Sequence, residues 1–302
     1  MSTSLAVPAM CPQLVSTLQH DLYPSISPEH ALKDAARGLS VLVTGSGRGI
    51  GRAEAIAFAR AGAKKVVLTS RSRAQLAEVK QRIEELEKGT EVVIVESDIT
   101  SEEAVDKLFA QAGEVDVLIN NAGFGETCRF IRDSNPADWR RALDINVMGT
   151  YLPTRAFLRA AHARGAQGKK LTVINTSSIG STHTLPRLSC YQSNKSMINR
   201  FTEFLHFEEP DVRTFAIHPG GVDTQLARSI LPEEVWPHLV DTPELAGGFV
   251  LWLATQDSAD FLRGRYISAN WDVDEVLAKK DEIVAKDLLW TRVAGQEQVM
   301  PK

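Results

Sequence analysis

The chain has 302 residues, a formal net charge of −4 and 24% charged residues, and neither sign of charge is gathered in blocks. This distribution offers no electrostatic footprint for nucleic acid or an anionic membrane, so we expect a small-molecule substrate rather than those partners. The three cysteines, Cys11, Cys128 and Cys190, are too few and too irregularly placed for a disulfide framework or a zinc site, and the seven histidines lack metal-ligand spacing. We therefore expect a reducing compartment and no metal.

The two ends of the chain carry no recognisable targeting signal. The start, M-S-T-S-L-A-V-P-A-M, lacks the basic residues and the sustained apolar stretch of a secretory signal, and no apolar run reaches transmembrane length. The final residues, V-M-P-K, match no peroxisomal or retention signal. These observations predict a cytoplasmic protein.

Strand and helix patterns alternate after a leader that contains four prolines. Short apolar runs predict strands buried on both faces at residues 39–44, 66–69, 92–95, 115–119, 171–175, 212–217 and 266–269. Helical patterns between them cover residues 53–61, 73–87, 102–112, 136–163, 189–207 and 243–254. Thr100-Ser-Glu-Glu103 predicts a capping box at the start of the third of these helices.

This alternation predicts the α/β class, with a doubly wound (Rossmann) parallel sheet of about seven strands. We expect a single catalytic domain over residues 39–271, with an N-terminal extension over residues 1–38 and a C-terminal extension over residues 272–302. In such a sheet, ligands bind beyond the carboxyl ends of the strands.

A glycine-rich segment, Thr44-Gly-Ser-Gly-Arg-Gly-Ile-Gly51, follows the first predicted strand and opens a helix. Glycines let the backbone turn tightly and approach a phosphate, while the helix start supplies unpaired N–H groups and a partial positive charge. The spacing of Gly45, Gly49 and Gly51 differs from the Gly-x-Gly-x-x-Gly fingerprint. Taken alone, the segment is compatible with a phosphate loop and with a flexible strand-to-helix turn.

This glycine spacing after a threonine resembles the short-chain dehydrogenase/reductase family, and further motifs follow in that family's order across residues 39–270. They are Asn120-Asn-Ala-Gly123, Asn146 in Ile145-Asn-Val-Met-Gly149, Ser178 in Asn175-Thr-Ser-Ser-Ile-Gly180, Tyr191-x-x-x-Lys195 and Pro219-Gly-Gly-Val-Asp-Thr224. Asn194 departs from the serine that many members carry, and we expect this to affect local packing only. The leader followed by a standard core also resembles fungal members that modify small secondary metabolites.

The resemblance implies an oxidoreductase that transfers a hydride between nicotinamide C4 and a ketone or secondary alcohol, with Asn146, Ser178, Tyr191 and Lys195 as the catalytic tetrad. Tyr191 would exchange a proton with the substrate oxygen, and Ser178 would hydrogen-bond the same oxygen. Lys195 would lower the tyrosine pKa and hold the nicotinamide ribose, and Asn146 would anchor a water that relays the proton.

Helical geometry supports this assignment, since residues four apart lie on one face, so that Tyr191 and Lys195 can reach the same ligand. A cation about 4 Å from a phenolate stabilises it by about 1 kcal/mol in water but by roughly 4 kcal/mol at an effective dielectric near 20, so burial decides the effect. The alternatives are a solvated Tyr–Lys pair, a serine that bonds backbone at a strand end, and a structural helix asparagine.

Charge near the end of the second strand indicates the cofactor. Ser70 stands where NAD-preferring relatives carry aspartate, Arg71 follows it, and Arg48 lies in the glycine turn as in NADP-preferring relatives. Because arginine binds a 2′-phosphate through paired hydrogen bonds, we expect NADP(H), although either arginine alone could be a solvated surface charge. Asp98 resembles the residue that contacts adenine, and helix capping beside Thr100 is the alternative. The predicted cofactor-binding residues are Gly45, Ser46, Arg48, Gly49, Ile50, Gly51, Ser70, Arg71, Asp98, Ile99, Asn121, Ala122, Gly123, Tyr191, Lys195, Pro219, Gly220, Val222 and Thr224.

The segment after Pro219 is predicted to cover the nicotinamide as a lid. The predicted substrate residues are Leu226 and Trp236 in this segment and Phe124, His183 and Leu185 opposite it. An apolar pocket of this kind suits a medium-sized apolar ketone or alcohol. We expect His218, beside Pro219, to be structural and Cys190 to be a free thiol.

Two apolar stripes run along the predicted helix that carries Tyr191. One contains Ile198, Phe201 and Leu205, and the other contains Met197, Phe204 and Phe207. A single core needs only one stripe, so the second predicts a partner subunit, as in the homodimers and homotetramers usual in this family. Burial inside a larger monomer is the alternative. The tail over residues 271–293 is expected to pack over the pocket or over the neighbouring subunit.

Two other function classes remain open from the sequence. One is a nicotinamide-binding regulator without turnover, and the other is a relative that catalyses dehydration, isomerisation or cyclisation without net redox change. The intact tetrad argues against the first, whereas the shape of the pocket decides the second.

Overall fold

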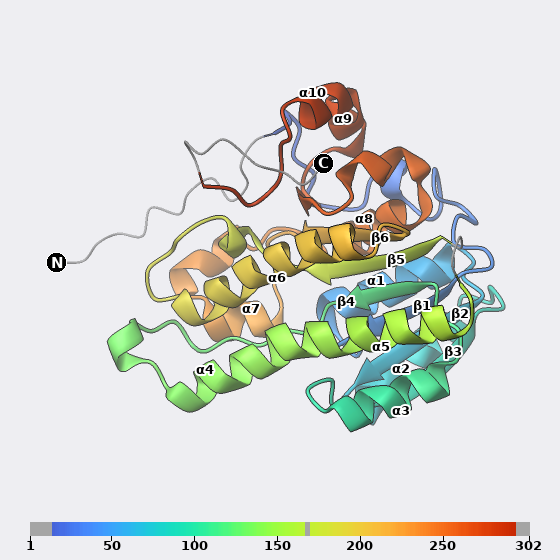
Figure 1. Ribbon diagram of the computed structural model, residues 1–302, viewed down its shortest axis with the longest axis horizontal. Coiled ribbons are helices and arrows are strands. Elements are labelled where there is room, and N and C mark those ends of the chain that lie inside the picture. The colour runs from blue at the N-terminus through green and yellow to red at the C-terminus, as the bar shows by residue number, and fades with distance from the viewer. Residues whose placement is uncertain (1–13, 167–169, 294–302) are drawn as a thin grey trace.

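The computed structural model describes residues 14–166 and 170–293 and is built around one seven-stranded sheet (Figure 1). The strand order is β3-β2-β1-β4-β5-β6-β7, and every neighbouring pair is parallel. The strands are β1 (Ser40–Thr44), β2 (Lys65–Ser70), β3 (Glu91–Glu96), β4 (Val117–Asn120), β5 (Leu171–Thr176), β6 (Val212–His218) and β7 (Tyr266–Ser268). The predicted doubly wound α/β fold is confirmed. Its strand order reverses between β1 and β4, which is where such sheets bind ligands.

Helices cover both faces of the sheet and create two apolar cores. Consecutive residues of β1 point to opposite faces, so Val41 and Val43 enter one core and Leu42 the other. The first core contains residues of α1 (Gly49–Arg60), α2 (Arg73–Glu84) and α8 (Pro243–Thr255); the second contains residues of α3 (Glu102–Ala112), α5 (Gly149–Ala163) and α6 (Ser189–Glu208). Burial on both faces explains the continuous apolar runs of the strands.

The helix predicted over residues 136–163 is interrupted. It consists of α4 (Pro136–Leu143), a π-helical turn (Asp144–Met148) and α5, and Asn146 lies in the π-helical turn. Such turns insert an extra residue into a helix and occur mostly at functional sites.

The predicted capping box at the start of α3 is wrong by one residue. Ser101 is the N-cap, and its hydroxyl accepts a hydrogen bond from the N–H of Ala104 at 3.2 Å. Glu103 accepts a bond from Lys107 at 2.7 Å instead of reaching back to the cap. Thr100 donates its N–H and its hydroxyl to the Asp98 carboxylate, at 3.0 and 2.8 Å.

The two extensions pack against each other and complete the first core. The N–H of Gln19 donates to the carbonyl of Asn270 at 2.7 Å, and the Tyr23 hydroxyl accepts from the N–H of Val273 at 2.9 Å. Ile26 and Trp271 are buried in the core that contains α8. The C-terminal extension continues with α9 (Val273–Ala278) and α10 (Lys280–Ala285). Residues 1–13 and 294–302, with the prolines at 8 and 12, Cys11 and the final V-M-P-K, lie outside the described residues.

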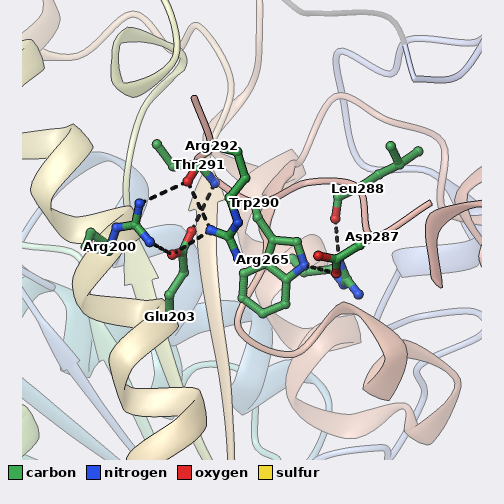
Figure 2. Close-up of polar contacts among 8 residues, drawn as sticks. All are labelled: Arg200, Glu203, Arg265, Asp287, Leu288, Trp290, Thr291 and Arg292. Carbon is green, nitrogen blue, oxygen red and sulfur yellow. Dashed lines mark hydrogen bonds and ion pairs between the residues drawn. The ribbon is translucent and has the colours of Figure 1, made fainter. Parts of the chain in front are cut away.

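The segment after α10 crosses the end of α6, as Figure 2 shows. Buried Glu203 of α6 accepts hydrogen bonds from the Arg200 side chain at 2.5 Å, the N–H of Thr291 at 3.0 Å and Arg292 at 2.9 Å. The Leu289 carbonyl accepts from the N–H of Tyr266 in β7 at 2.9 Å. The described part of the tail therefore packs on α6 and the edge of β7 and does not line the pocket, so of the two predicted positions only the one over a neighbouring subunit stays a prediction.

The two apolar stripes of α6 have different environments. Ile198 and Leu205 are buried, whereas Met197, Phe204 and Phe207 are 52%, 56% and 46% exposed. Trp290 of the tail stacks on Phe207 with ring centroids 5.9 Å apart, but it leaves the rest of the stripe open. Burial of this stripe inside the monomer is therefore excluded for the described residues.

Candidate active site

The glycine loop between β1 and α1 depends on glycine at specific positions. Gly45 and Gly49 have φ angles of +67° and +55°, a left-handed conformation that glycine adopts without strain. At Gly51, a Cβ would lie 2.4 Å from Nδ2 of Asn121 and 2.6 Å from the carbonyl oxygen of Gly45. The absence of side chains allows the loop to pack directly on the end of β4.

Side chains at the strand ends hold this loop in place. The Thr44 hydroxyl accepts hydrogen bonds from the N–H groups of Asn121 and Ala122 at 3.0 and 3.1 Å. Ser46 is fully buried, and its hydroxyl accepts from the N–H of Thr69 in β2 at 2.9 Å. The Ser46 side chain therefore faces the sheet, and this geometry does not support its predicted contact with a cofactor.

The end of β2 carries Ser70 and Arg71, and the glycine loop beside it carries Arg48. Ser70 is half-buried beside Gly47, where a Cβ would approach its hydroxyl to 3.2 Å, and Arg71 is exposed. Arg48 is also exposed, and its guanidinium bonds the Gln225 side chain at the start of α7 (Gln225–Ile230). Arg48 therefore links the glycine loop to the segment predicted to act as a lid.

Asp98 and Ile99 follow β3 and have different roles. The hydrogen bond from the N–H of Thr100 holds the pKa of Asp98 below its usual range, and the charge of Arg71 acts in the same direction. The exposed carboxylate thus stabilises the turn before α3, although Ser101 caps that helix. Ile99 is 8% exposed and packs on Gly149, where a Cβ would lie 2.7 Å from its Cδ1. Its side chain belongs to the second core.

Ser178, Tyr191 and Lys195 come together where β5 ends and α6 begins. Asn146 borders them across Gly123, where a Cβ would lie 3.3 Å from Oδ1 of Asn146 and 3.8 Å from the Lys195 ammonium. Ser178 follows β5, where its hydroxyl accepts from the N–H of Gly180 at 3.1 Å and hydrogen-bonds Tyr191. Lys195 is 2% exposed, with its ammonium 5.6 Å from the centroid of the Tyr191 ring. The ammonium donates to the carbonyl of Thr176 at 2.6 Å. The alternative of a solvated Tyr–Lys pair is therefore excluded.

Burial controls the protonation of this pair. It raises the pKa of Tyr191 to about 12, which the hydrogen bond with Ser178 partly opposes. It also lowers the pKa of Lys195 to about 8. Desolvation disfavours both the phenolate and the charged lysine, so burial outweighs any lowering of the tyrosine pKa, and the predicted effect of Lys195 on that pKa stays a prediction. At neutral pH Tyr191 is a phenol that can donate its proton.

Asn146 uses both side-chain groups to hold the loop after β4. Its Oδ1 accepts from the N–H of Phe124 at 2.9 Å, and its Nδ2 donates to the carbonyl of Phe124 at 2.7 Å. The side chain is fully buried. This geometry favours the structural alternative, in which Asn146 fixes the loop that leads from Gly123 toward Tyr191.

Two residues that sequence reasoning did not place in the catalytic set support the cavity wall. His218 is buried, burial lowers its pKa to about 4, and its Nδ1 accepts from the N–H of Ile179 at 3.1 Å, in agreement with a structural role. Asp241 bonds the N–H of Gly221 and also His20 of the N-terminal extension. Asp241 was missed because no motif surrounds it, whereas the Pro-Gly-Gly segment that it supports was recognised.

An apolar cavity of about 180 Å³ lies beside the catalytic pair and opens to solvent. Leu185 and Leu226 line it as predicted, and α7 with the 3₁₀ segment Glu233–His238 covers it. Nine predicted cofactor residues also line it, namely Ile50, Asn121, Gly123, Tyr191, Lys195, Pro219, Gly220, Val222 and Thr224. Lining residues missed from the sequence include Cys128, Leu188, Gln192 and Leu239.

Three predicted substrate residues do not line this cavity. Phe124 lies under Arg141, with the guanidinium carbon 4.4 Å from the ring centroid. Trp236 turns its indole N–H to the Leu231 carbonyl at 3.1 Å. His183 lines a separate neighbouring cavity. These predictions are wrong because side-chain direction in a loop depends on its backbone torsions and local packing.

Comparison with known proteins identifies the family. The profile described as short chain dehydrogenase matches residues 40–235. The chain belongs to the short-chain dehydrogenase family. It is therefore a member of a family of oxidoreductases that bind a nicotinamide cofactor, NAD or NADP.

Fungal relatives and solved structures resemble this family member over most of their length. It is 39% identical to the short chain dehydrogenase mpl6 of Monascus purpureus, over 91% of this chain and 94% of that protein. It is 33% identical to the short chain dehydrogenase andI of Emericella variicolor, over 91% of this chain and 94% of the relative.

Two solved structures carry cofactors. A 3-ketoacyl-(acyl-carrier-protein) reductase from Brucella melitensis complexed with NADH superposes with a TM-score of 0.68 at 27% identity, covering 77% of this chain and 96% of that one. An alcohol dehydrogenase from Thermococcus sibiricus complexed with 5-hydroxy-NADP gives a TM-score of 0.66 at 26% identity, with the same two coverages.

Across residues 14–166 and 170–293, no helix is long and apolar enough to cross a membrane. In the same residues, no three histidine, cysteine or acidic side chains are grouped as metal ligands.

Proposed function

We propose that this short-chain dehydrogenase is an NADP(H)-dependent reductase of a ketone on a medium-sized apolar molecule, with Tyr191 as the general acid. The observation that carries the proposal is the position of Tyr191, hydrogen-bonded to Ser178 and next to buried Lys195, in the wall of an apolar cavity. The ketoacyl reductase from Brucella melitensis supports a carbonyl substrate.

The residues at the carboxyl edge of the sheet fit a nicotinamide dinucleotide. A Cβ at Gly49 would meet only the Thr224 side chain, at 3.4 Å or more, so the loop leaves room next to the helix N-terminus, where a pyrophosphate is favoured. Lys195 and Thr224 would hold the nicotinamide half. Arg48 and Arg71 would bind a 2′-phosphate, while Ser70 carries no charge that would repel it.

Ser178, Tyr191 and Lys195 would together deliver a proton to the substrate oxygen. When bound, the cofactor supplies the hydride that reduces the carbonyl carbon. Ser178 donates a hydrogen bond to the carbonyl oxygen, and the phenol of Tyr191 transfers its proton to that oxygen, leaving a phenolate that Lys195 stabilises. A tyrosine pKa of about 12 keeps the acid protonated at neutral pH, which is the form that the reduction needs.

The test is NADPH oxidation, with NADH in parallel, against a panel of apolar ketones and diketones. Tyr191→Phe keeps the ring and removes the acid, so we expect ketone-dependent oxidation to fall by a factor of about 10² to 10⁴, the range for general acid catalysis. NADPH binding should be retained in this variant. Equal turnover by wild type and Tyr191→Phe would refute the role of Tyr191.

The exposed stripe of α6 supports a further proposal, that the active form is a homodimer or homotetramer. Met197 and Phe204 are exposed on this helix. Met148 of the π-helical turn is 40% exposed, and Tyr151 of α5 is 41% exposed. Exposed apolar side chains gathered on adjacent helices mark protein interfaces.

A further inference from the structure

A second cavity, of about 560 Å³ and open to solvent, lies beside the apolar one and has a different lining. Both cavities are lined by Gly180, Leu185, Pro186 and Gln192. The remaining lining of the second cavity contains three basic residues and six hydroxyls, namely Arg132, His183 and Arg187 with Ser181, Thr182, Thr184, Ser189, Ser193 and Ser196. This composition suits an anionic group, whereas the first cavity suits an apolar one.

Hydrogen bonding and close packing hold the wall that the two cavities share. The Gln192 side chain accepts a hydrogen bond from the N–H of Leu185 at 2.9 Å, which fastens the wall to the helix turn that follows Tyr191. At Gly180, a Cβ would lie 2.9 Å from Cγ of Gln192, so the two elements are in direct contact there. A ligand that passes over this wall would occupy both cavities.

Arg187 has the features of an anchoring cation. Its φ of +77° is rare for a residue with a side chain and costs roughly 1–3 kcal/mol, a strain that is concentrated at binding and catalytic sites. Its carbonyl accepts from the N–H of Arg129 at 2.8 Å, which fixes the turn. Within residues 14–166 and 170–293, no carboxylate forms an ion pair with Arg187, whereas Arg132 pairs with Asp133 at 3.6 Å.

Basic residues of the second cavity act electrostatically on groups of the first. The positive charge of Arg187 lowers the pKa of the Cys128 thiol, although burial outweighs it and the thiol pKa is raised overall. A charge on His183 likewise lowers the pKa of His218. Cys128 lines the first cavity, so the charge of Arg187 is within range of a ligand bound beside Tyr191.

We propose that the second cavity binds the carboxylate of an elongated keto acid, with Arg187 as its anchor, while the ketone of the same molecule lies at Tyr191. The planar guanidinium matches a carboxylate through two parallel hydrogen bonds. The hydroxyls of Thr184 and Ser189 in the same lining can donate further ones. The other four hydroxyls donate to backbone carbonyls and shape the wall. This inference rests on the proposed ketone reduction and adds that the substrate carries an acid at one end.

The experiment uses a series of (ω−1)-oxo acids, which carry a methyl ketone at the end opposite the acid, of increasing chain length, and their methyl esters, with wild type, Arg187→Gln and Arg187→Lys. At the best chain length, we expect kcat/KM of wild type to favour the acid over its ester. Arg187→Gln should lower kcat/KM for the acid about 10- to 100-fold, mainly through KM, and leave the ester unchanged, because a lost charge-assisted hydrogen bond is worth a factor of this size. Arg187→Lys should recover part of the loss. Arg159→Gln, which removes an exposed charge from α5, is the matched control.

The two proposals fail in distinguishable ways. Turnover of acids and esters with equal kcat/KM in wild type and Arg187→Gln would overturn the anchoring role while leaving ketone reduction intact. If no compound is reduced, the proposed function fails, and calorimetric titration of the same acids and esters still decides the anchor. Tighter binding of the acid that is lost in Arg187→Gln supports it, and equal binding overturns it.

Discussion

Glu54 on α1 provides the sharpest stability test, because it is a carboxyl group fully removed from solvent. Neither of its carboxyl oxygens has a hydrogen-bond partner among the described residues. Burial raises its pKa from 4.5 to about 8. The folded protein therefore keeps a proton on Glu54 up to about pH 8, whereas the unfolded chain releases it near pH 4.5.

Between these two pH values the unfolded state binds fewer protons than the folded state, so the free energy of unfolding falls as pH rises. The stability associated with the protonated Glu54 is therefore fully present below about pH 4.5 and is lost as pH rises toward 8. Over an interval of about 3.5 pH units, at 1.36 kcal/mol per unit, the free energy of unfolding falls by roughly 5 kcal/mol at most.

Urea unfolding at pH 5, 6, 7 and 8 measures this effect in wild type, Glu54→Gln and Glu54→Leu. We expect both variants to lose the downward slope of wild type, with Glu54→Leu more stable at pH 8 because leucine has no polar atoms that need partners. Glu78→Gln, at an exposed position of α2, is the control and should retain the wild-type slope. Parallel stability curves for wild type and Glu54→Gln would refute the reasoning.

Three further predictions concern the cofactor and the assembly. Ser70→Asp places a carboxylate where the 2′-phosphate is expected, so the ratio of kcat/KM for NADPH over NADH should fall at least about 10-fold; an unchanged ratio would contradict the cofactor assignment. Gly51→Ala forces a Cβ to 2.4 Å from Asn121, so NADPH should bind at least about 10-fold more weakly in a fluorescence titration, and wild-type affinity would count against the loop geometry. Phe204→Glu puts a charge on the exposed stripe of α6 and should shift the protein to monomer in sedimentation velocity, whereas Glu78→Gln should not; an unaltered assembly would exclude this stripe as the interface.

Much of the fold was predictable because its signals are local. Strands buried on both faces need continuous apolar runs, and the structure has its seven strands within two residues of the predicted ends. The glycine turn was also predictable, since the left-handed torsions of Gly45 and Gly49 and the contact at Gly51 exclude most other residues.

The contacts of a side chain could not be predicted from the sequence where several partners were within its reach. Ser46 lies in the glycine loop, yet its hydroxyl bonds β2, a strand formed by residues well beyond the loop. Asn146 belongs to the predicted tetrad, yet its amide holds Phe124. The tail could have covered the pocket by its apolar pattern alone, but Glu203 and the free edge of β7 bind it elsewhere.

The sequence by itself determined the order of the strands along the chain, the glycine loop and the residues available for catalysis, because each depends on torsions or periodicity within a short segment. Only the tertiary structure decided which side chains face the cavity and how they are protonated. Tyr191 has a pKa of about 12 and Lys195 one of about 8 because distant segments remove them from water, and desolvation depends on everything packed around a group rather than on its neighbours in the chain.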